Sequence, residues 1–132
     1  MATILSFTEL KVWQKARILC KSVHELTLIE KFANDYGLKN QISNSSGSIM
    51  DNIAEGFGRK GNREFINFLA YANGSALECC SQIYRAYDKR YISDINKLEI
   101  ISLIDEITKM INAMIIYLGR SDLKGEKFKS RN

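Results

Sequence analysis

The chain has 132 residues, is 45% apolar and 26% charged, and carries a formal net charge of +4 at pH 7. A chain of this length buries about two thirds of its unfolded surface in a single core, so the length fits one domain and excludes a second. It contains no proline, which a chain that is helical throughout tolerates best. We therefore expect an all-α fold.

Neither a secretory signal nor a membrane span is expected. The first residues lack the basic segment that precedes the apolar core of a signal peptide. The densest later apolar run extends only from Met110 to Leu118 and contains Asn112, whereas a helix needs about 20 apolar residues to cross a bilayer. The three cysteines lack C-x-x-C spacing, which favours reduced thiols. We expect a cytoplasmic protein without membrane association.

The first predicted helix covers residues 8–31, with Thr8 as its N-cap. Its apolar residues alternate in spacing between four and three, which places them on one helical face. They are Val12, Ala16, Leu19, Val23 and Leu26. The residues Asn34, Asp35 and Gly37 then predict a turn.

The second predicted helix covers residues 38–57, although its middle reads SNSSGS, which by propensity alone favours a loop. The apolar residues Leu38, Ile42, Ile49 and Ile53 share one helical face. Ser45 and Ser46 fall on the same face, where small side chains would let two helices approach closely. We therefore expect the helix to continue through the serines.

The third and fourth helices are predicted over residues 63–89 and 94–118, with Asn62 capping the third and Ser93 or Asp94 capping the fourth. Apolar stripes support both helices. In the third they are Phe65, Leu69, Ala72, Ala76, Cys79, Ile83 and Ala86; in the fourth, Leu98, Ile101, Ile104, Ile107, Ile111, Met114 and Leu118. Short connections then predict an antiparallel up-and-down four-helix bundle over residues 1–118.

The fourth helix has more apolar residues than one bundle needs. Six of them lie off its main stripe: Ile100, Leu103, Met110, Ile115, Ile116 and Tyr117. A helix that is apolar around most of its circumference is usually buried on two sides. We therefore expect a homo-oligomer, in which another copy of the chain covers the second side.

The basic charge is concentrated after the bundle, in residues 119–132. This segment carries Arg120, Lys124, Lys127, Lys129 and Arg131 against two acids, Asp122 and Glu126. The body of the chain is close to neutral. We expect a flexible basic tail that contributes nonspecific charge.

The segment GFGRKG at residues 56–61 has the G-x-G-x-x-G spacing of a dinucleotide-binding loop. That motif needs a strand before it and a parallel sheet around it, and the sequence predicts neither. We expect a helix connection, in which Gly56 or Gly58 takes the left-handed conformation that ends the second helix and Gly61 turns into the third. No cofactor is expected.

No catalytic or metal-binding arrangement is predicted. The single histidine, His24, has no cysteine or serine partner in a recognisable spacing. Asp51 and Glu55 are spaced as a carboxylate pair on one helical face, but Glu55 is better placed to pair with Arg59 or Arg63. We expect no enzymatic activity.

Basic residues form the candidate binding groups. Arg59, Lys60 and Arg63 cluster beside a helix N-terminus, and Lys11 and Lys15 share a helix face. A third group, Arg85, Lys89 and Arg90, lies near Tyr84, Tyr87 and Tyr91. Lysine and arginine neutralise phosphates, and neighbouring tyrosines can stack on unpaired bases. Taken alone, each group is more often a solvated helix face, because acids interleave and the body of the chain is near neutral.

Several motifs resemble a known family. They are NIAEGFGR at residues 52–59, FINFL at 65–69 and ANGSALE at 72–78, with FTELKVWQKA at 7–16 and YGLKNQI at 36–42. Together they resemble the proteins encoded in intervening sequences of bacterial 23S ribosomal RNA genes, a superfamily that includes the accessory variability proteins of diversity-generating retroelements. Within the motifs, Asn52, Glu55, Gly56, Gly58, Gly74 and Ser75 are the structural signature.

The resemblance implies four antiparallel helices, a ring of identical subunits that is most often a pentamer, and no enzymatic activity. For the retroelement branch it implies binding of a reverse transcriptase and its template RNA through a basic surface. The chain departs from the family at residues 43–46, which are Ser-Asn-Ser-Ser rather than basic, and at Arg90, where the family has glycine. RNA binding is the leading hypothesis, and a protein-interaction scaffold is the alternative.

Overall fold

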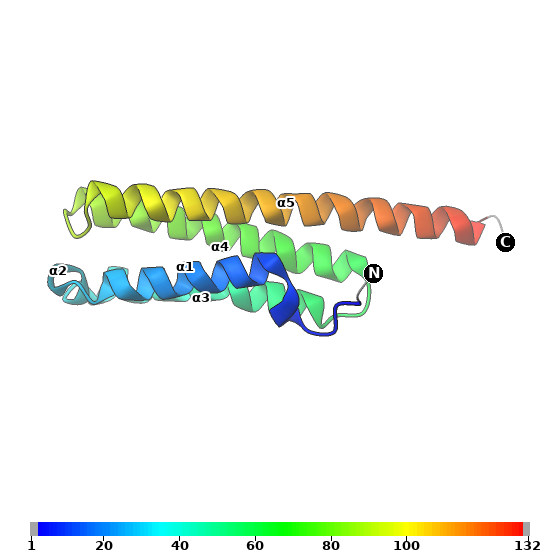
Figure 1. Cartoon of the computed structure of the whole chain (residues 1–132), viewed down its shortest axis with the longest axis horizontal. Coiled ribbons are helices and arrows are strands. Elements are labelled where there is room, and N and C mark those ends of the chain that lie inside the picture. The colour runs from blue at the N-terminus through cyan, green and yellow to red at the C-terminus, as the bar shows by residue number, and fades with distance from the viewer. Residues whose placement is uncertain (1–2, 131–132) are drawn as a thin grey trace.

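The computed structural model describes residues 3–130, and their side chains as far as residue 121. Within this part the chain is entirely helical (Figure 1). One 3-10 helix, η1 (Phe7–Glu9), precedes five α-helices, and no strand is present among the described residues. The α-helices are α1 (Lys11–Thr27), α2 (Glu30–Ala33), α3 (Tyr36–Phe57), α4 (Asn62–Asp88) and α5 (Asp94–Ser130).

The four longer helices lie side by side and run back and forth along one long axis (Figure 1). α3 packs against α1 and α4, and α5 packs against α4 and α1, so each long helix touches two others. η1 lies against α1 and α3 at the end of the molecule where α3 meets α4. The predicted all-α helical bundle is confirmed, with five α-helices rather than four.

The extra helix arises because the first predicted helix, 8–31, is broken twice. Ser6, not Thr8, caps the first turn, and Glu9 completes a reciprocal capping box with it. Leu10 then adopts an extended conformation with ψ 125°, so α1 starts only at Lys11. Ile29 is extended in the same way, with ψ 128°, and begins α2. Both breaks occur at residues with good helical periodicity, which periodicity alone could not reveal.

The core contains nearly all of the predicted apolar stripes. In α1 and α3 each predicted apolar position is buried, together with Ser45 and Ser46. In α5 the prediction was wrong at the first turns, because Ile100 is buried while Leu98 is 64% exposed. The buried series Ile100, Ile104, Ile107 and Ile111 keeps helical spacing, and Leu98 lies to one side of it.

The serine-rich part of α3 is helical because its hydroxyls find partners across and along the helices. Ser45 donates to the carboxamide oxygen of Gln82 on α4 at 2.6 Å. Ser46 donates to the backbone oxygen of Ser43 at 3.3 Å. Buried hydroxyls that are hydrogen-bonded cost little, and small side chains bring the helices together.

The last helix is longer than predicted. α5 continues past Leu118 to Ser130, beyond the start of α4 (Figure 1). The expected boundary at residue 118 corresponds to the last turn that packs on α4, where the Asn62 carboxamide donates to the Leu118 backbone oxygen at 3.3 Å. Arg120 is exposed. The other basic residues expected in the tail lie outside the described side chains. No helix in the described residues is long and apolar enough to cross a membrane.

The connection between α4 and α5 is closed by a left-handed residue, Arg90, with φ 62°. The Arg90 amide donates to the Tyr87 oxygen and the Tyr91 amide to the Ala86 oxygen, the pattern of a Schellman helix end. Glycine adopts this conformation without steric cost, whereas the Cβ atom of Arg90 makes it less favourable.

Gly56 allows α3 and α4 to touch. A Cβ atom at this position would lie 2.7 Å from the Phe68 Cβ and 3.0 Å from the Phe65 Cδ1. Both neighbours belong to α4, and Gly56 itself is buried. A larger side chain would therefore push the two helices apart.

We predict that Gly56→Ala lowers the free energy of unfolding by about 1–3 kcal/mol, as overpacking of a core does. Gly47→Ala, in the same helix, should raise it by about 0.5–1 kcal/mol, because nothing lies within 4 Å of its added Cβ and alanine is the better helix former. Urea unfolding followed by circular dichroism measures both. Equal effects of the two substitutions would contradict the close approach at Gly56.

Candidate nucleic-acid interface

The α3–α4 connection forms one end of the bundle and carries three of the predicted binding residues. α3 continues through Gly56 to Phe57, and its C-cap residue Gly58 is right-handed, with a φ of −75°. The prediction of a left-handed Gly56 or Gly58 was therefore wrong. The change of direction occurs at Gly61, with φ 111°, which also takes the N-cap position predicted for Asn62. The Asn62 side chain is instead used to bind α5.

Arg59 is held in place by two contacts. Its Nη2 atom lies 2.7 Å from the Glu55 carboxylate, one helical turn earlier. Its guanidinium group lies over the ring of Phe68 on α4, 5.0 Å from the centroid. The Arg59 side chain remains 46% exposed. The Arg59 side chain is thus held in place and accessible. The Glu55 carboxylate beside it, however, offsets its positive charge.

Lys60 and Arg63 are both exposed beside Arg59. Within the described side chains neither forms an ion pair. Because the amide groups at the start of α4 point toward the same end, the helix dipole adds to the positive potential there. This connection therefore presents a cluster of cations, of which Lys60 and Arg63 are unpaired among the described side chains, to an anionic ligand.

Two aromatic residues, Phe68 and Tyr71, extend this site along α4. Their rings meet edge to face, with centroids 5.7 Å apart and planes at 87°. Tyr71 is 60% exposed. We refer to Arg59, Lys60, Arg63, Phe68 and Tyr71 together as the basic–aromatic patch. Neither aromatic was predicted as a site residue from the sequence, although their i, i+3 spacing on a predicted helix could have indicated a shared face.

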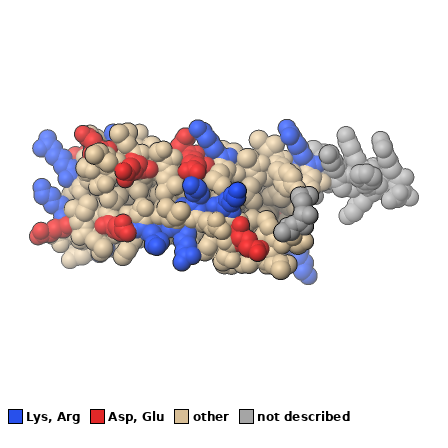
Figure 2. All heavy atoms as spheres, viewed as in Figure 1, with Lys and Arg blue, Asp and Glu red and all other residues tan. Residues whose placement is uncertain are grey.

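Lys11 and Lys15 do not join this patch. Lys15 Nζ lies 3.1 Å from the Glu106 carboxylate of α5, whereas Arg59 packs on α4. Lys11 is exposed on α1. On the face where α1 and α5 lie nearest the viewer, basic and acidic side chains are interspersed along the molecule (Figure 2). Lys11 and Lys15 therefore lie on a different helix from the patch, and an acid of α5 offsets Lys15.

Several members of the third basic group, at the opposite end of the bundle, are engaged in internal contacts. Lys89 Nζ and the Tyr91 hydroxyl both donate to one oxygen of Asp35, each at 2.9 Å. The Tyr87 hydroxyl bonds to Asp94, and Lys97 lies over the Tyr87 ring at 4.0 Å. These tyrosines fasten turns together, so they are not free to stack on bases.

Asp35 is the centre of this contact network. The hydrogen bond from Lys89 and those from the Leu38 amide and Tyr91 lower the pKa of Asp35 from 3.8 to about 2. The hydrogen bond between Asp35 and Tyr91 also raises the pKa of the Tyr91 hydroxyl. Asp35 also caps α3 through the Leu38 amide at 3.1 Å, and its bond to Lys89 joins this start of α3 to the end of α4.

The family motif residues lie mainly at the α3–α4 contact. The Asn52 carboxamide donates to the backbone oxygen and the hydroxyl of Ser48 at 2.8 and 2.9 Å. Ser75 on α4 hydrogen-bonds to the same Ser48 hydroxyl at 3.0 Å. Gly74 is exposed, and nothing lies within 4 Å of an added Cβ. No contact in the described structure explains why Gly74 is glycine.

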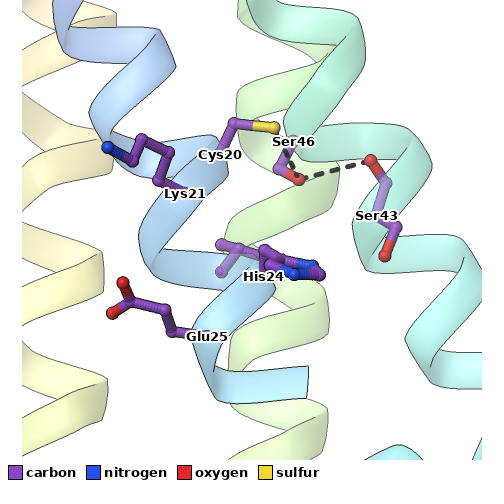
Figure 3. Close-up of a pocket in the computed structure, with 7 residues that line it drawn as sticks. Cys20, Lys21, His24, Glu25, Ser43 and Ser46 are labelled. Atoms are coloured by element: carbon purple, nitrogen blue, oxygen red, sulfur yellow. Dashed lines mark hydrogen bonds between the residues drawn. The ribbon is translucent and has the colours of Figure 1, made fainter. Parts of the chain in front are cut away.

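A groove of about 330 Å³ between α1 and α3 is the other feature with reactive side chains. Cys20 and His24 point from α1 toward Ser43 and Ser46 of α3, while Lys21 points away (Figure 3). The Ser46 hydroxyl donates weakly to the Cys20 sulfur at 4.0 Å. Cys20 and His24 offer two metal donors, and the described residues contain no group of three or more His, Cys, Asp or Glu that could hold a metal ion.

The other two thiols are held in unreactive surroundings. Burial raises the pKa of Cys79 to about 12, and it also raises the pKa of Cys80. A thiol acts as a nucleophile only when ionised, so Cys79 is a small core side chain. Both cysteines lie on α4, within the bundle.

These observations define a helical-bundle protein with exposed basic and aromatic side chains at one end. Residues 8–113 match the family of 23S rRNA-intervening sequence proteins, and because this match spans most of the chain, the protein belongs to that family. The predicted family resemblance is thereby confirmed.

A solved structure shows the same fold. It is a protein of unknown function from the S23 ribosomal protein family of Bacteroides thetaiotaomicron, and the two structures superpose with a TM-score of 0.73. The match covers 79% of this chain and 97% of that protein, at 23% sequence identity. No curated protein matches this sequence significantly.

Acid should weaken the Asp35 network in a defined pH range. A carboxylate whose pKa is lower in the folded state stabilises the fold above its unfolded pKa, and this contribution is lost as the pH falls through the folded value. We predict that wild type exceeds Asp35→Asn in stability at neutral pH and that the difference disappears as the pH approaches about 2. Asparagine keeps the capping ability, so the difference reports the charge. A pH-independent gap in urea unfolding would contradict it.

Proposed function

We propose that this protein is a non-enzymatic, self-associating helical bundle that binds RNA through phosphate contacts of the 23S rRNA-intervening sequence type. The observation that carries the proposal is the cluster of Arg59, Lys60 and Arg63 on a helix connection that close packing holds in place. Three cations at one helix N-terminus suit a phosphate backbone. Lys11 and Lys15 form a separate, weaker site, because Glu106 offsets one of them.

The size of the electrostatic contribution can be bounded. Each phosphate that a cation neutralises adds roughly 0.7–0.9 to the slope of log affinity against log salt concentration. Arg59 already pairs with Glu55, so its contribution depends on exchanging that carboxylate for a phosphate. Exposed ion pairs are worth only about 0–1 kcal/mol, so the exchange costs little.

Replacement of Arg59, Lys60 and Arg63 by alanine should therefore weaken RNA binding and reduce the magnitude of the salt slope by roughly 1 for each phosphate contact that is lost. Fluorescence anisotropy with a labelled RNA at several salt concentrations measures both quantities. The control replaces Lys21, Lys31 and Lys39 by alanine, which removes the same charge away from the α3–α4 connection. Equal losses of RNA affinity in the two variants would show that net charge alone causes the effect. No RNA binding at low salt would contradict the proposed function.

Self-association is supported by large apolar side chains that remain exposed on α4 and α5. Leu77 is 64% exposed, Leu98 64%, Ile95 68%, Ile116 55% and Tyr117 70%. Of the residues that the sequence analysis placed outside the main stripe of the last helix, Ile116 and Tyr117 are exposed and Ile100 is buried. Large exposed apolar side chains mark interaction sites, and a second copy of the chain is the occupant that we propose, in a ring of about five.

Light scattering coupled to size-exclusion chromatography should then give a multiple of the 15.1-kDa chain mass. The double substitution Leu98→Glu and Ile116→Glu should shift the mass toward a single chain. Leu28→Glu provides the control, because Leu28 is also exposed, at 62%, but lies at the end of α1. A wild-type monomer would contradict the proposal, as would an unchanged mass in the double variant.

The alternative function, a protein-interaction scaffold that docks a partner such as a reverse transcriptase, rests on the same apolar surface. It differs from the first in one respect, because it requires no RNA binding. A self-associated protein that fails to bind RNA at low salt would favour the scaffold.

A further inference from the structure

The basic–aromatic patch contains an element that phosphate binding does not require. Tyr71 is 60% exposed on a regular helix, and within the described side chains its hydroxyl has no hydrogen-bond partner. Tyr87 and Tyr91, by contrast, bind carboxylates. The Phe68 ring supports Tyr71 edge-on, so Tyr71 is braced from one side and open on the other.

The charges around Tyr71 are nearly balanced. Arg59, Lys60 and Arg63 are opposed by Glu55 and by Glu64, which is exposed one turn before Phe68 on α4. The remaining excess is one positive charge, so RNA binding through phosphates would gain from a contribution that does not depend on charge. A flat aromatic face adds affinity that does not depend on net charge, about 1–3 kcal/mol for each stacked base.

Helix geometry aligns the groups that a nucleotide chain would meet. Arg63, Asn67 and Tyr71 follow at intervals of four residues, so they form one ridge on α4 that is about 12 Å long. Arg63 and Asn67 are also exposed. Along the ridge, Arg63 thus offers a cation for a phosphate, Asn67 a carboxamide for a base edge, and Tyr71 an aromatic face.

We propose that Tyr71 is a base-stacking site and that the ligand class of this surface is single-stranded RNA. This inference rests on the proposed RNA binding and specifies it further. In an A-form duplex the bases are stacked on each other, and the deep major groove is closed to side chains, so a ring on a convex helix surface reaches only unpaired bases. Arg59, over the Phe68 face, fixes the orientation of the aromatic pair.

Tyr71→Leu tests the stacking directly. It should weaken binding of an unpaired oligoadenylate by about tenfold or more, leave the salt slope unchanged, and leave binding of an RNA duplex with the same number of phosphates unaffected. Tyr71→Phe should retain the affinity, because the ring is kept. Tyr36→Leu is the matched control, since Tyr36 is 70% exposed but begins α3 at the opposite end of the bundle.

The outcomes separate the two proposals. If wild type binds duplex and single strand equally and Tyr71→Leu changes neither, the stacking site is refuted while RNA binding stands. If wild type binds neither RNA at low salt, the proposed function fails and the stacking site fails with it. Circular dichroism and urea unfolding establish that each variant is folded, and loss of the single-strand preference in folded Tyr71→Leu alone supports the proposal.

Discussion

The close contact between α3 and α4 is the constraint on which the rest of the structure depends. Gly56 leaves no room for a Cβ against Phe68. Farther along the same contact, Ser45 bonds to Gln82, and Ser48 bonds to Ser75. Small side chains bring the backbones together, and the hydroxyls satisfy each other where apolar groups would otherwise be needed. The serine-rich segment is thus a packing element within a helix.

This contact also explains where the candidate interface lies. Because the end of α3 is pressed onto the first turns of α4, the short connection between them places Arg59 over Phe68. Phe68 in turn braces Tyr71. The family motif around Asn52 and Gly56 therefore determines helix packing. The side chains available to a ligand are those of the basic–aromatic patch, which lies beside the motif at the end of the α3–α4 contact.

Four ion pairs among the described side chains take up part of the surface charge, which limits what electrostatics can do at those positions. Ion pairs join Lys15 to Glu106, Lys89 to Asp35 and Lys109 to Asp105, besides the one at Arg59. Such exposed pairs contribute at most about 1 kcal/mol each, but they remove local positive potential. A basic isoelectric point therefore does not predict where this surface binds anions. The positions of the unpaired cations determine that.

Much of the fold could be predicted because apolar periodicity is a local property. The stripes of α1, α3 and α4 and the buried serines follow from spacing alone. The breaks at Leu10 and Ile29 could not be predicted, since both residues fit the helical pattern. In α5, residues 98–101 fit two overlapping stripes, and only contact with α1 and α4 selects Ile100 over Leu98.

The candidate site, like the fold, could be predicted from the sequence only in part. The sequence by itself determined the helical class, the buried faces, the family and the cluster at Arg59, Lys60 and Arg63, because these depend on residues close together in the chain. Only the tertiary structure decided that Lys15 is neutralised by Glu106 and that Arg59 reaches Phe68 beside Tyr71. Those facts depend on which side chain a neighbouring helix presents, and helix packing, unlike periodicity, is set by the whole chain.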